Sequence, residues 1–385
     1  MGDLSGALTA VQMALRLRNE LSWIHSDTAS YIYFLGVTNL EMGDHKAAAE
    51  ELQRAASMRR ELLGEHEATA CCYHYLGVAQ GYMGDHDAAL ISLQKALDMR
   101  RKLLGEHEAT ACSYHCLGVA QIYMGDYDEA LISLQKALDM RRKLLGAHAE
   151  TASTFYSLGR LHLTMDAINL AFEALQNAAY MRAHILGDHN DTATSYLWLG
   201  AVQLEIGDLN GAFESVQKSL QIRQKLLGDH SDTAASIHLL GIVYYVMDDN
   251  KSALEKFQTA LNMRSKLLGK HEDTAYSYFY RGKVQMEMGD FKEAVESFQK
   301  SLQLRQELLG NHSDTAESFL SLALAYCALG DKISSLTALQ KAFDCIMSHL
   351  LSCHDNTVCS YQLLAELQGI VQELNREIES CIKSR

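Results

Sequence analysis

The stretch KLLGDHSDTAAS, Lys225–Ser236, combines a glycine, two acids, a histidine, serines and a threonine within twelve residues. Such a mixture suits either a catalytic loop or a connector between helices. His230 decides between them, because it belongs to a row of histidines 41 residues apart, with a final step of 42. The row is His25, His66, His107, His148, His189, His230, His271, His312 and His354. A segment that recurs nine times in one chain is a connector between repeats.

The repeat extends well beyond the histidine. A threonine three residues after each histidine, such as Thr233, recurs with the same 41-residue step. So does a glutamine thirteen residues before the histidine, such as Gln217. Residues 64–104 and 105–145 are identical at 36 of 41 positions, which indicates an internal duplication. The 385 residues contain no proline, so little interrupts their helices. We therefore expect one repeating architecture along the whole chain.

Each unit predicts two helices. In EATACCYHYLGVAQGYM, which starts at Glu67, apolar and small residues recur every three or four positions, the helical period. A Gly-Asp turn follows, and a second amphipathic helix ends at Leu-Leu-Gly. Small residues at one phase of each helix, such as Gly77 and Ala89, predict close helix crossings. The pattern predicts an all-α solenoid of antiparallel helix pairs with a 41-residue repeat.

Two turns depart from the Gly-Asp pattern. Residues 163–172 lack it, which predicts a distorted repeat around Gly159. Asp248 stands where glycine usually does, and aspartate tolerates the left-handed backbone better than most residues.

Three rows of polar residues need an interpretation. The histidine can cap the following helix or pack against the neighbouring connector. Equivalent histidines of adjacent repeats cannot share one metal ion, because they lie about 10 Å apart whereas a zinc–nitrogen bond is about 2 Å long. The row that includes Arg141 lies in the last turns of the second helices, where a cation is favourable; a phosphate-binding stripe is the alternative. For the glutamine row that includes Gln217, we predict a repeated hydrogen bond between helices.

Composition restricts the possible partners. The net charge of −14 disfavours nucleic acid, and no apolar run is long enough to span a membrane. The first residues do not resemble a signal peptide, so we expect a cytoplasmic location. The nine cysteines form no CxxC pair, so we predict reduced thiols, no metal site and no cofactor. No nucleotide-binding or nucleophile motif is present, which predicts a chain that is not an enzyme and has no small-molecule substrate.

The unit resembles the tetratricopeptide repeat (TPR). The family pattern of an aromatic residue, Leu-Gly, alanine, a large apolar residue and alanine corresponds to Tyr73, Leu76, Gly77, Ala89, Leu93 and Ala96. The usual repeat has 34 residues and a proline near its end, whereas this unit has 41 residues and no proline. The longer second helix and the connector resemble kinesin light chain, nephrocystin-3 and the TPR arrays of STAND-type ATPases.

The resemblance implies a right-handed superhelix and suggests boundaries within the chain. We expect residues 1–24 to form the second helix of an incomplete repeat, 25–358 to form eight repeats, and 359–385 to form a capping helix. The chain would then begin with a second helix that lacks its first, which leaves an apolar side exposed. We expect either that the sequence is a piece of a longer protein or that something else covers this side.

The resemblance also implies a concave groove lined by the first helices. The residues that we expect to bind a partner there are Tyr33, His74, Tyr75, Tyr82, His115, Tyr123, Tyr156, Arg160, Trp198, His238, Tyr245, Tyr276, Phe279, Tyr280 and Lys283. The alternative is that many of the tyrosines only pack between first helices. If His74, His115 and His238 line the groove, binding should respond between about pH 5 and 7.

The leading hypothesis is a protein-interaction scaffold. An aromatic lining suits a protein or peptide segment with apolar or aromatic anchors. Only Arg160 and Lys283 are basic among the predicted groove residues, so we do not expect capture of a C-terminal carboxylate. The alternative is a sensing or autoinhibitory arm of a larger signalling protein, of the STAND or motor-adaptor type.

Overall fold

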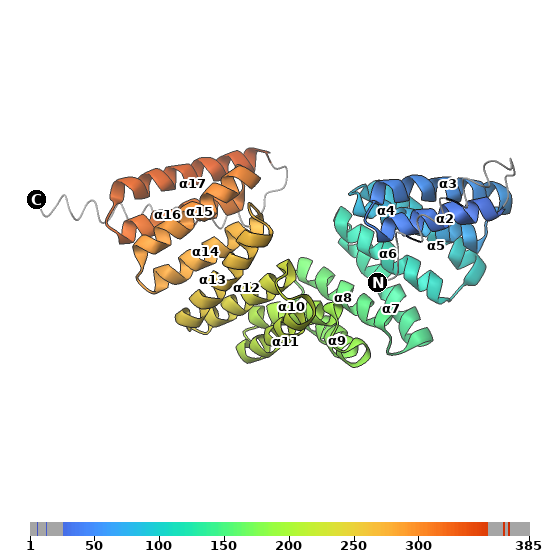
Figure 1. Ribbon diagram of the computed structural model, residues 1–385, viewed down its shortest axis with the longest axis horizontal. Coiled ribbons are helices and arrows are strands. Elements are labelled where there is room, and N and C mark those ends of the chain that lie inside the picture. Colours follow the sequence, from blue (N-terminus) through green and yellow to red (C-terminus); the bar gives the residue numbers. More distant parts are fainter. Residues whose placement is uncertain (1–5, 7–12, 14–25, 353–364, 366–368, 370–385) are drawn as a thin grey trace, which may run out of the picture. The chain divides into compact units, whose positions relative to one another are not determined.

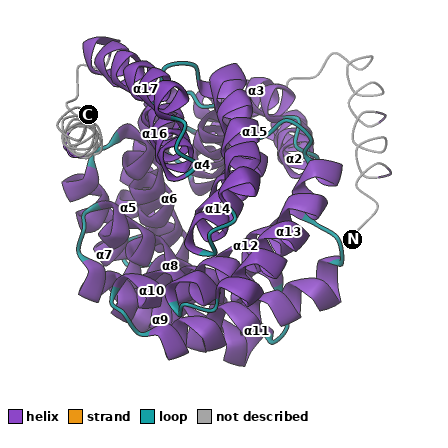
Figure 2. Ribbon diagram, turned by 90° about the vertical axis from the view of Figure 1, so that its left-hand side faces the viewer, coloured by secondary structure: helices purple, strands orange, loops and turns teal. Residues whose placement is uncertain are grey.

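The structure is a computed structural model that describes residues 26–352 and four isolated residues, Gly6, Met13, Ala365 and Gly369. The incomplete first repeat predicted at 1–24 and the capping helix predicted at 359–385 therefore lie outside the continuous described range. Within that range the chain forms sixteen helices and no strand, joined by the short loops that Figure 2 shows.

The helices belong to two compact units, residues 1–187 and 188–385, each of which is considered by itself. In the first unit they are α2 (Ser26–Glu41), α3 (His45–Leu63), α4 (Glu67–Tyr82), α5 (His86–Leu104), α6 (Glu108–Met124), α7 (Tyr127–Leu145), α8 (Ala149–Thr164) and α9 (Ile168–Leu186). In the second they are α10 (Asn190–Glu205), α11 (Leu209–Leu227), α12 (Ser231–Val246), α13 (Asn250–Leu267), α14 (Glu272–Glu287), α15 (Phe291–Leu309), α16 (Ser313–Ala328) and α17 (Lys332–Ser352). Each pair forms an antiparallel hairpin, and successive hairpins stack within each unit (Figure 1). The predicted helix-pair solenoid is confirmed.

The connector histidine caps the first helix of each described pair from α4 onward. Nδ1 of His66 accepts a hydrogen bond from the backbone N–H of Ala68 at 3.1 Å. The same bond is made by His107, His148, His189, His230, His271 and His312. The ring nitrogen thereby satisfies one of the N–H groups that every helix leaves unpaired at its start. Of the two roles that the sequence allows, the structure shows capping.

Aspartate replaces glycine in the two irregular turns. Asp248 has φ of 63°, the left-handed value expected there, and Asp166 has φ of 58°. The expectation of a distorted repeat around Gly159 is wrong, because α8 and α9 keep the 16- and 19-residue lengths of their neighbours. Asp166 supplies the backbone conformation of the missing glycine, and Ala167 occupies the N-cap position without a side-chain cap bond.

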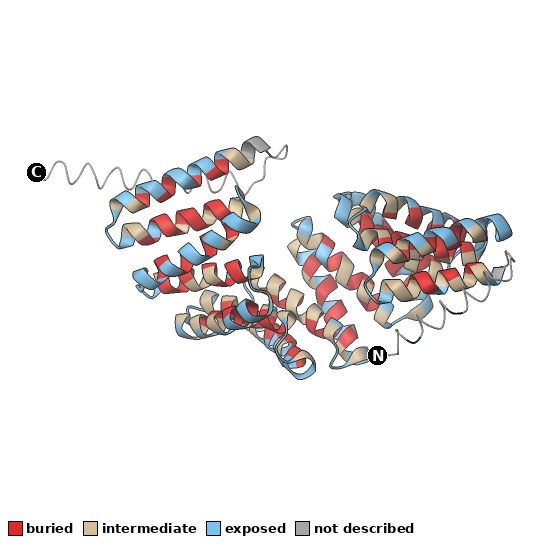
Figure 3. Ribbon diagram, turned by 45° about the horizontal axis from the view of Figure 1, so that its top comes forward, coloured by how far each residue is buried: buried red, intermediate tan, exposed pale blue. Residues whose placement is uncertain are grey.

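The recurrent small residues are where the two helices of a hairpin meet. A methyl group added to Gly77 of α4 would lie 2.6 Å from Cγ of Leu93 and 3.0 Å from the carbonyl oxygen of Ala89, both in α5. Ala89 itself is fully buried. The close crossing predicted from the small residues is thus confirmed, and the helices carry buried and exposed residues on different sides (Figure 3).

The arginine row is buried, which overturns the phosphate-stripe alternative. Arg141 of α7 is only 1% exposed. Its guanidinium donates to the carbonyl oxygen of Glu150 at 2.8 Å and to the hydroxyl of Thr154 at 2.7 Å, both in α8. The same pair of bonds, nine and thirteen residues along the chain, is made by Arg59, Arg100, Arg223, Arg264 and Arg305. These arginines join each hairpin to the next.

The glutamine row makes the expected hydrogen bond between helices at only some of its described positions. Gln94, Gln135 and Gln340 donate to an aspartate four residues later on their own helix, and they do not bridge helices. Two members do bridge: Gln299 donates to the hydroxyl of Tyr326, and Gln258 accepts from the guanidinium of Arg281 in α14 at 2.9 Å. The repeated hydrogen bond across the hairpin comes from another glutamine: Gln80 accepts from Ser92 at 2.7 Å, and Gln121, Gln203 and Gln285 accept in the same way.

Consecutive first helices also contact each other directly. In the first unit α2, α4, α6 and α8 form one such row, and in the second unit α10, α12, α14 and α16 form another. No pair of consecutive second helices in the described range makes contacts of this extent. Because the first helices approach more closely, each row bends toward them. We call the surface of each unit that its first helices form its first-helix face.

Candidate functional site on the first-helix face

Large aromatic side chains are exposed on the first helices of the first unit. The exposed fractions are 56% for Phe34, 67% for Tyr82 and 63% for Tyr123. Two of these rings have a neighbour on the preceding hairpin: Tyr82 stacks on His45 at 4.9 Å between centroids, and Tyr123 stacks on His86 at 5.1 Å. The stacking orients each tyrosine without removing it from solvent.

The second unit carries a continuous aromatic cluster. The rings of Tyr276 and Tyr280 lie 4.9 Å apart on α14, and their hydroxyl groups are 3.3 Å apart. His238 of α12 packs against both rings, at 5.2 and 5.4 Å. Burial, followed by the neighbouring Tyr276, raises the pKa of Tyr280, so its hydroxyl stays protonated. Tyr276 is 38% exposed and is the member that reaches solvent.

A charged group adjoins this cluster. The ammonium of Lys283 lies 5.0 Å from the ring centroid of Phe279 and 3.9 Å from the carboxylate of Glu317 on α16. The same carboxylate lies 3.5 Å from the guanidinium of Arg305. Burial raises the pKa of Glu317, although the two cations act in the opposite direction.

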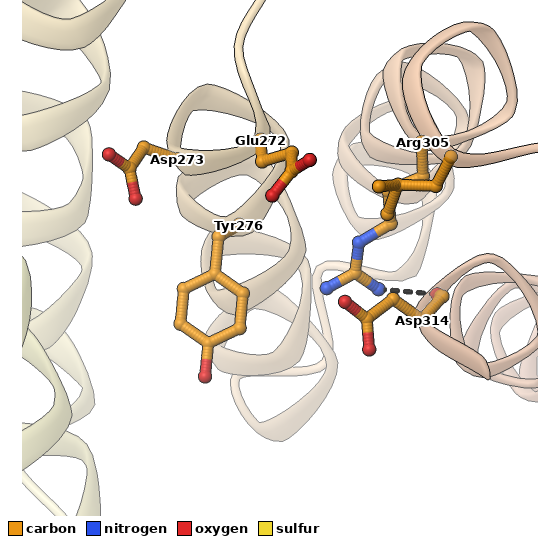
Figure 4. A pocket seen from close by; sticks show the side chains of 6 residues that line it. Glu272, Asp273, Tyr276, Arg305 and Asp314 are labelled. Atoms are coloured by element: carbon orange, nitrogen blue, oxygen red, sulfur yellow. Dashed lines mark hydrogen bonds between the residues drawn. The ribbon is translucent and has the colours of Figure 1, made fainter. Parts of the chain in front are cut away.

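A pocket of about 250 Å³ opens beside Tyr276. It is lined by Glu272, Asp273, Tyr276, Arg305, Leu309 and Asp314. Figure 4 shows the guanidinium of Arg305 bonded to Asp314, with the carboxylates of Glu272 and Asp273 on the side of α14. Glu272 and Asp314 place two carboxylates beside the single guanidinium of Arg305, which makes the pocket attractive to a cationic group, and the tyrosine ring offers an apolar surface next to it. The third carboxylate, that of Asp273, lies 3.7 Å from the guanidinium of Arg264.

Three residues predicted to line the groove are buried. Phe279 is 1% exposed and packs against Phe298 in the core. His74 and His238 are 6% and 4% exposed. We therefore correct their assignment: each contributes to packing between helices and presents no contact surface. Their register is that of the groove positions, but neighbouring helices cover them: α15 covers Phe279, and α13 and α14 cover His238.

The other predicted residues are partly or fully exposed. Tyr82, Tyr123, Arg160 and Tyr276 are exposed, whereas Tyr33, Tyr75, His115, Tyr156, Trp198, Tyr245, Tyr280 and Lys283 are half-buried. Tyr33 illustrates the second group, because its ring packs against Tyr75 at 5.9 Å and under the guanidinium of Arg59 at 4.6 Å. For Tyr33 and Tyr75, packing between first helices is therefore the observed role.

The pH response expected of a histidine-lined groove is not supported. Burial, together with the charge of Arg141, lowers the pKa of His115 to about 4. Burial and the charge of Arg264 also lower the pKa of His238 well below its ordinary value. Neither ring gains a proton between about pH 5 and 7, so neither can make binding depend on pH there.

His238 instead makes stability depend on pH. In the unfolded chain its imidazole is protonated below about pH 6.5, whereas in the folded chain it stays neutral. The unfolded state binds the extra proton, so stability is complete above that pH and falls as pH drops, by at most about 1.4 kcal/mol per pH unit. We expect His238→Phe, the residue at the equivalent position 279, to remove this loss. Urea unfolding of both proteins at about pH 7, 6 and 5 checks it; parallel pH profiles would contradict the prediction.

Comparison with known families assigns the repeat. A model described as Tetratricopeptide repeat matches residues 27–102, 109–183, 191–266 and 273–348, most of the chain. The chain belongs to the tetratricopeptide repeat family. Each match covers two TPR hairpins. No curated protein matches the sequence.

Solved structures with the same fold include other TPR arrays. One is a STAND protein with a TPR sensor from Pyrococcus horikoshii, with 12% identity, a TM-score of 0.63, and coverage of 90% of this chain and 54% of that one. Another is the apo form of the quorum sensor NprR from B. thuringiensis, with 13% identity, a TM-score of 0.62, and coverage of 89% and 99%. A third is BtubC (BKLC) from P. vanneervenii, with 20% identity, a TM-score of 0.51, and coverage of 60% and 94%.

Sequence reasoning missed the charged side of the TPR site. Arg305 belongs to the row of Arg141, which the sequence places in the last turns of the second helices, and no motif singles out Glu272 or Asp273. A usable signal existed: Tyr276 follows Glu272 by four residues, which places both on one side of α14.

Among the described residues, no helix has both the length and the apolar character needed to cross a membrane.

Proposed function

We propose that this TPR chain is a non-enzymatic interaction module that binds a protein or peptide segment on the first-helix face of its second unit. The observation that supports this most directly is the aromatic cluster around Tyr276 and Tyr280, with the acidic pocket beside it. Interfaces concentrate their binding energy in such aromatic anchors. We keep Trp198, Tyr245, Tyr280 and Lys283 as candidate contacts, together with Tyr276.

The chemistry of the surface defines the partner. An apolar or aromatic side chain would pack on Tyr276, and a cationic group one or two residues away would enter the pocket beside Glu272 and Asp314. The stacked hairpins hold these groups in place before binding, so the ordering cost falls mainly on the partner. Neither nucleic acid nor a membrane surface suits an acidic pocket of this kind.

A double variant tests the proposal. Trp198→Ala combined with Tyr280→Ala should weaken binding of a captured partner by at least about 100-fold, because each aromatic anchor is worth about 2 kcal/mol or more. Partners are captured on the immobilised wild-type chain and their affinities are measured by titration against each variant. The control is Leu226→Ala combined with Ile333→Ala, two exposed apolar residues of second helices. Equal affinity for the wild type and the first double variant would refute binding at this face.

The alternative is that the chain serves as the sensing or autoinhibitory arm of a larger signalling protein. It is supported by similarity to the STAND protein, of which a TPR sensor is only a part. Identification of a nucleotide-binding domain in the same gene product would favour this alternative. A cytoplasmic location remains a prediction in both cases.

A further inference from the structure

A second cluster of reactive side chains lies in the first unit, on α4 and α6. It consists of His74 from α4, and Cys112 and Cys116 from α6. Their donor atoms all lie within 4.8 Å of one another, and Nε2 of His74 is 3.7 Å from Sγ of Cys112. In the part of the chain that the structure describes, this is the only group of three potential metal ligands of these types.

We propose that His74, Cys112 and Cys116 bind one zinc(II) ion. Zinc–sulfur bonds of about 2.3 Å and zinc–nitrogen bonds of about 2.0–2.1 Å place tetrahedral ligand atoms about 3.5–4 Å apart. The observed separations are close to this range, so small side-chain rotations complete the site. The sequence predicted no metal site, because it has no CxxC pair and the histidines of the connector row are too far apart to share one ion.

The helix geometry explains why these residues converge. Cys112 and Cys116 are four residues apart, which places both thiols on one side of α6. His74 faces them from α4, and these two first helices are in direct contact. The site therefore lies between neighbouring repeats. Its two cysteines stand at different positions of the repeat, equivalent to Cys71 and Tyr75 in the preceding one.

The ligand set selects a thiophilic ion. Two thiolates and an imidazole suit zinc, whereas magnesium and calcium prefer oxygen ligands. Zinc(II) with two thiolates is electrically neutral, which suits the largely enclosed surroundings of the buried His74. Two ring nitrogens near the site, Nδ1 of His74 and Nδ1 of His115, are buried without a hydrogen-bond partner.

The duplicated repeats provide an internal comparison. Residues 64–104 and 105–145 differ at only five positions, and one of them sets Tyr75 against Cys116. The arrangement one repeat earlier therefore holds Tyr33, Cys71 and Tyr75, with a single thiol. One repeat later, His115 is followed by Ser153 and Ser157. The site therefore differs from the arrangement one repeat earlier at two ligand positions, with His74 in place of Tyr33 and Cys116 in place of Tyr75.

Three protein ligands leave the fourth zinc position for water or for a group from a bound molecule. Because the ligands come from α4 and α6, the ion would tie two adjacent first helices together. This inference does not rest on the proposed function, which concerns the second unit.

Metal titration of the full-length, reduced chain tests the site. Cobalt(II) serves as the spectroscopic probe, and zinc(II) is then added to displace it. We expect a thiolate-to-cobalt charge-transfer band that saturates at one equivalent. Cys116→Tyr, which installs the residue of the preceding repeat, should abolish the band. Because changes outside the ligand set already cost about 10–100-fold in affinity, losing a ligand should weaken zinc binding by more than about 100-fold.

Matched variants make the result decisive. Cys71→Ser removes the lone thiol at the equivalent position of the preceding repeat and should leave both the band and the zinc affinity unchanged. Cys116→Ser serves as a second, smaller substitution if the tyrosine variant does not fold, as judged by circular dichroism. Absence of the band in the wild type, or its persistence in the Cys116 variants, would overturn the proposal.

Discussion

Replacing Arg305 with alanine should destabilise the second unit by about 3 kcal/mol. The Arg305 guanidinium, 2% exposed, donates to the carbonyl oxygen of Asp314 at 2.6 Å and to the hydroxyl of Ser318 at 2.8 Å. It also lies 4.6 Å from the centre of the Phe279 ring. Hydrogen bonds to a charged group contribute about 1.5–3 kcal/mol each, and the loss leaves buried acceptors unpaired.

Urea unfolding of the full chain, analysed with a nearest-neighbour model for repeats, measures the loss. Arg305→Lys should recover only part of it, because lysine keeps the charge but is shorter than arginine, whose Nη1 reaches both acceptors, and lacks the planar guanidinium that lies over the Phe279 ring. Gln306→Ala is the control, since Gln306 is the exposed next residue of α15. An alanine variant at 305 within about 0.5 kcal/mol of the wild type would show that the arginine row does not hold hairpins together.

Two glycines one turn apart on α4 should respond to alanine in opposite directions. At Gly77 the added methyl group meets Cγ of the buried Leu93 at 2.6 Å and the backbone oxygen of Ala89 at 3.0 Å. The backbone contact cannot be relieved by a side-chain rotation, so α4 must move away from α5. Overpacking of this kind costs about 1–3 kcal/mol, and we expect about 2 kcal/mol at Gly77.

At Gly81 the added methyl group meets nothing within 4 Å. Gly81→Ala should therefore stabilise the helix by up to about 1 kcal/mol, the difference in helix propensity between the two residues. The shift of the urea midpoint in each variant gives the sign directly. Stabilisation by alanine at both sites would mean that the hairpin crossing is looser than the structure shows.

Much of the fold was predictable because its signals are local and repeated. The histidine cap involves neighbours two residues apart, and the turn at Asp248 depends on one backbone conformation. The pairing of Gly77 with Ala89 follows from helical periodicity within one hairpin. In each case the interacting residues are close in the chain, so spacing alone identifies them.

The candidate sites were only partly predictable. Register assigned His238 and Phe279 to the groove, yet side chains of neighbouring helices cover both. Tyr276 was placed correctly as an exposed residue, but the carboxylates beside it were not recognised as a pocket. Register states which side of a helix a residue occupies, whereas exposure depends on how near the next helix lies.

By itself, the sequence determined the helix pair, its 41-residue period, its caps and its close crossings, because these depend on short-range geometry repeated along the chain. Only the tertiary structure decided that Arg305 joins successive hairpins and that His74 meets Cys112 and Cys116. The physical reason is distance in the chain: His74 and Cys112 are 38 residues apart, and they meet only when two separate hairpins have packed.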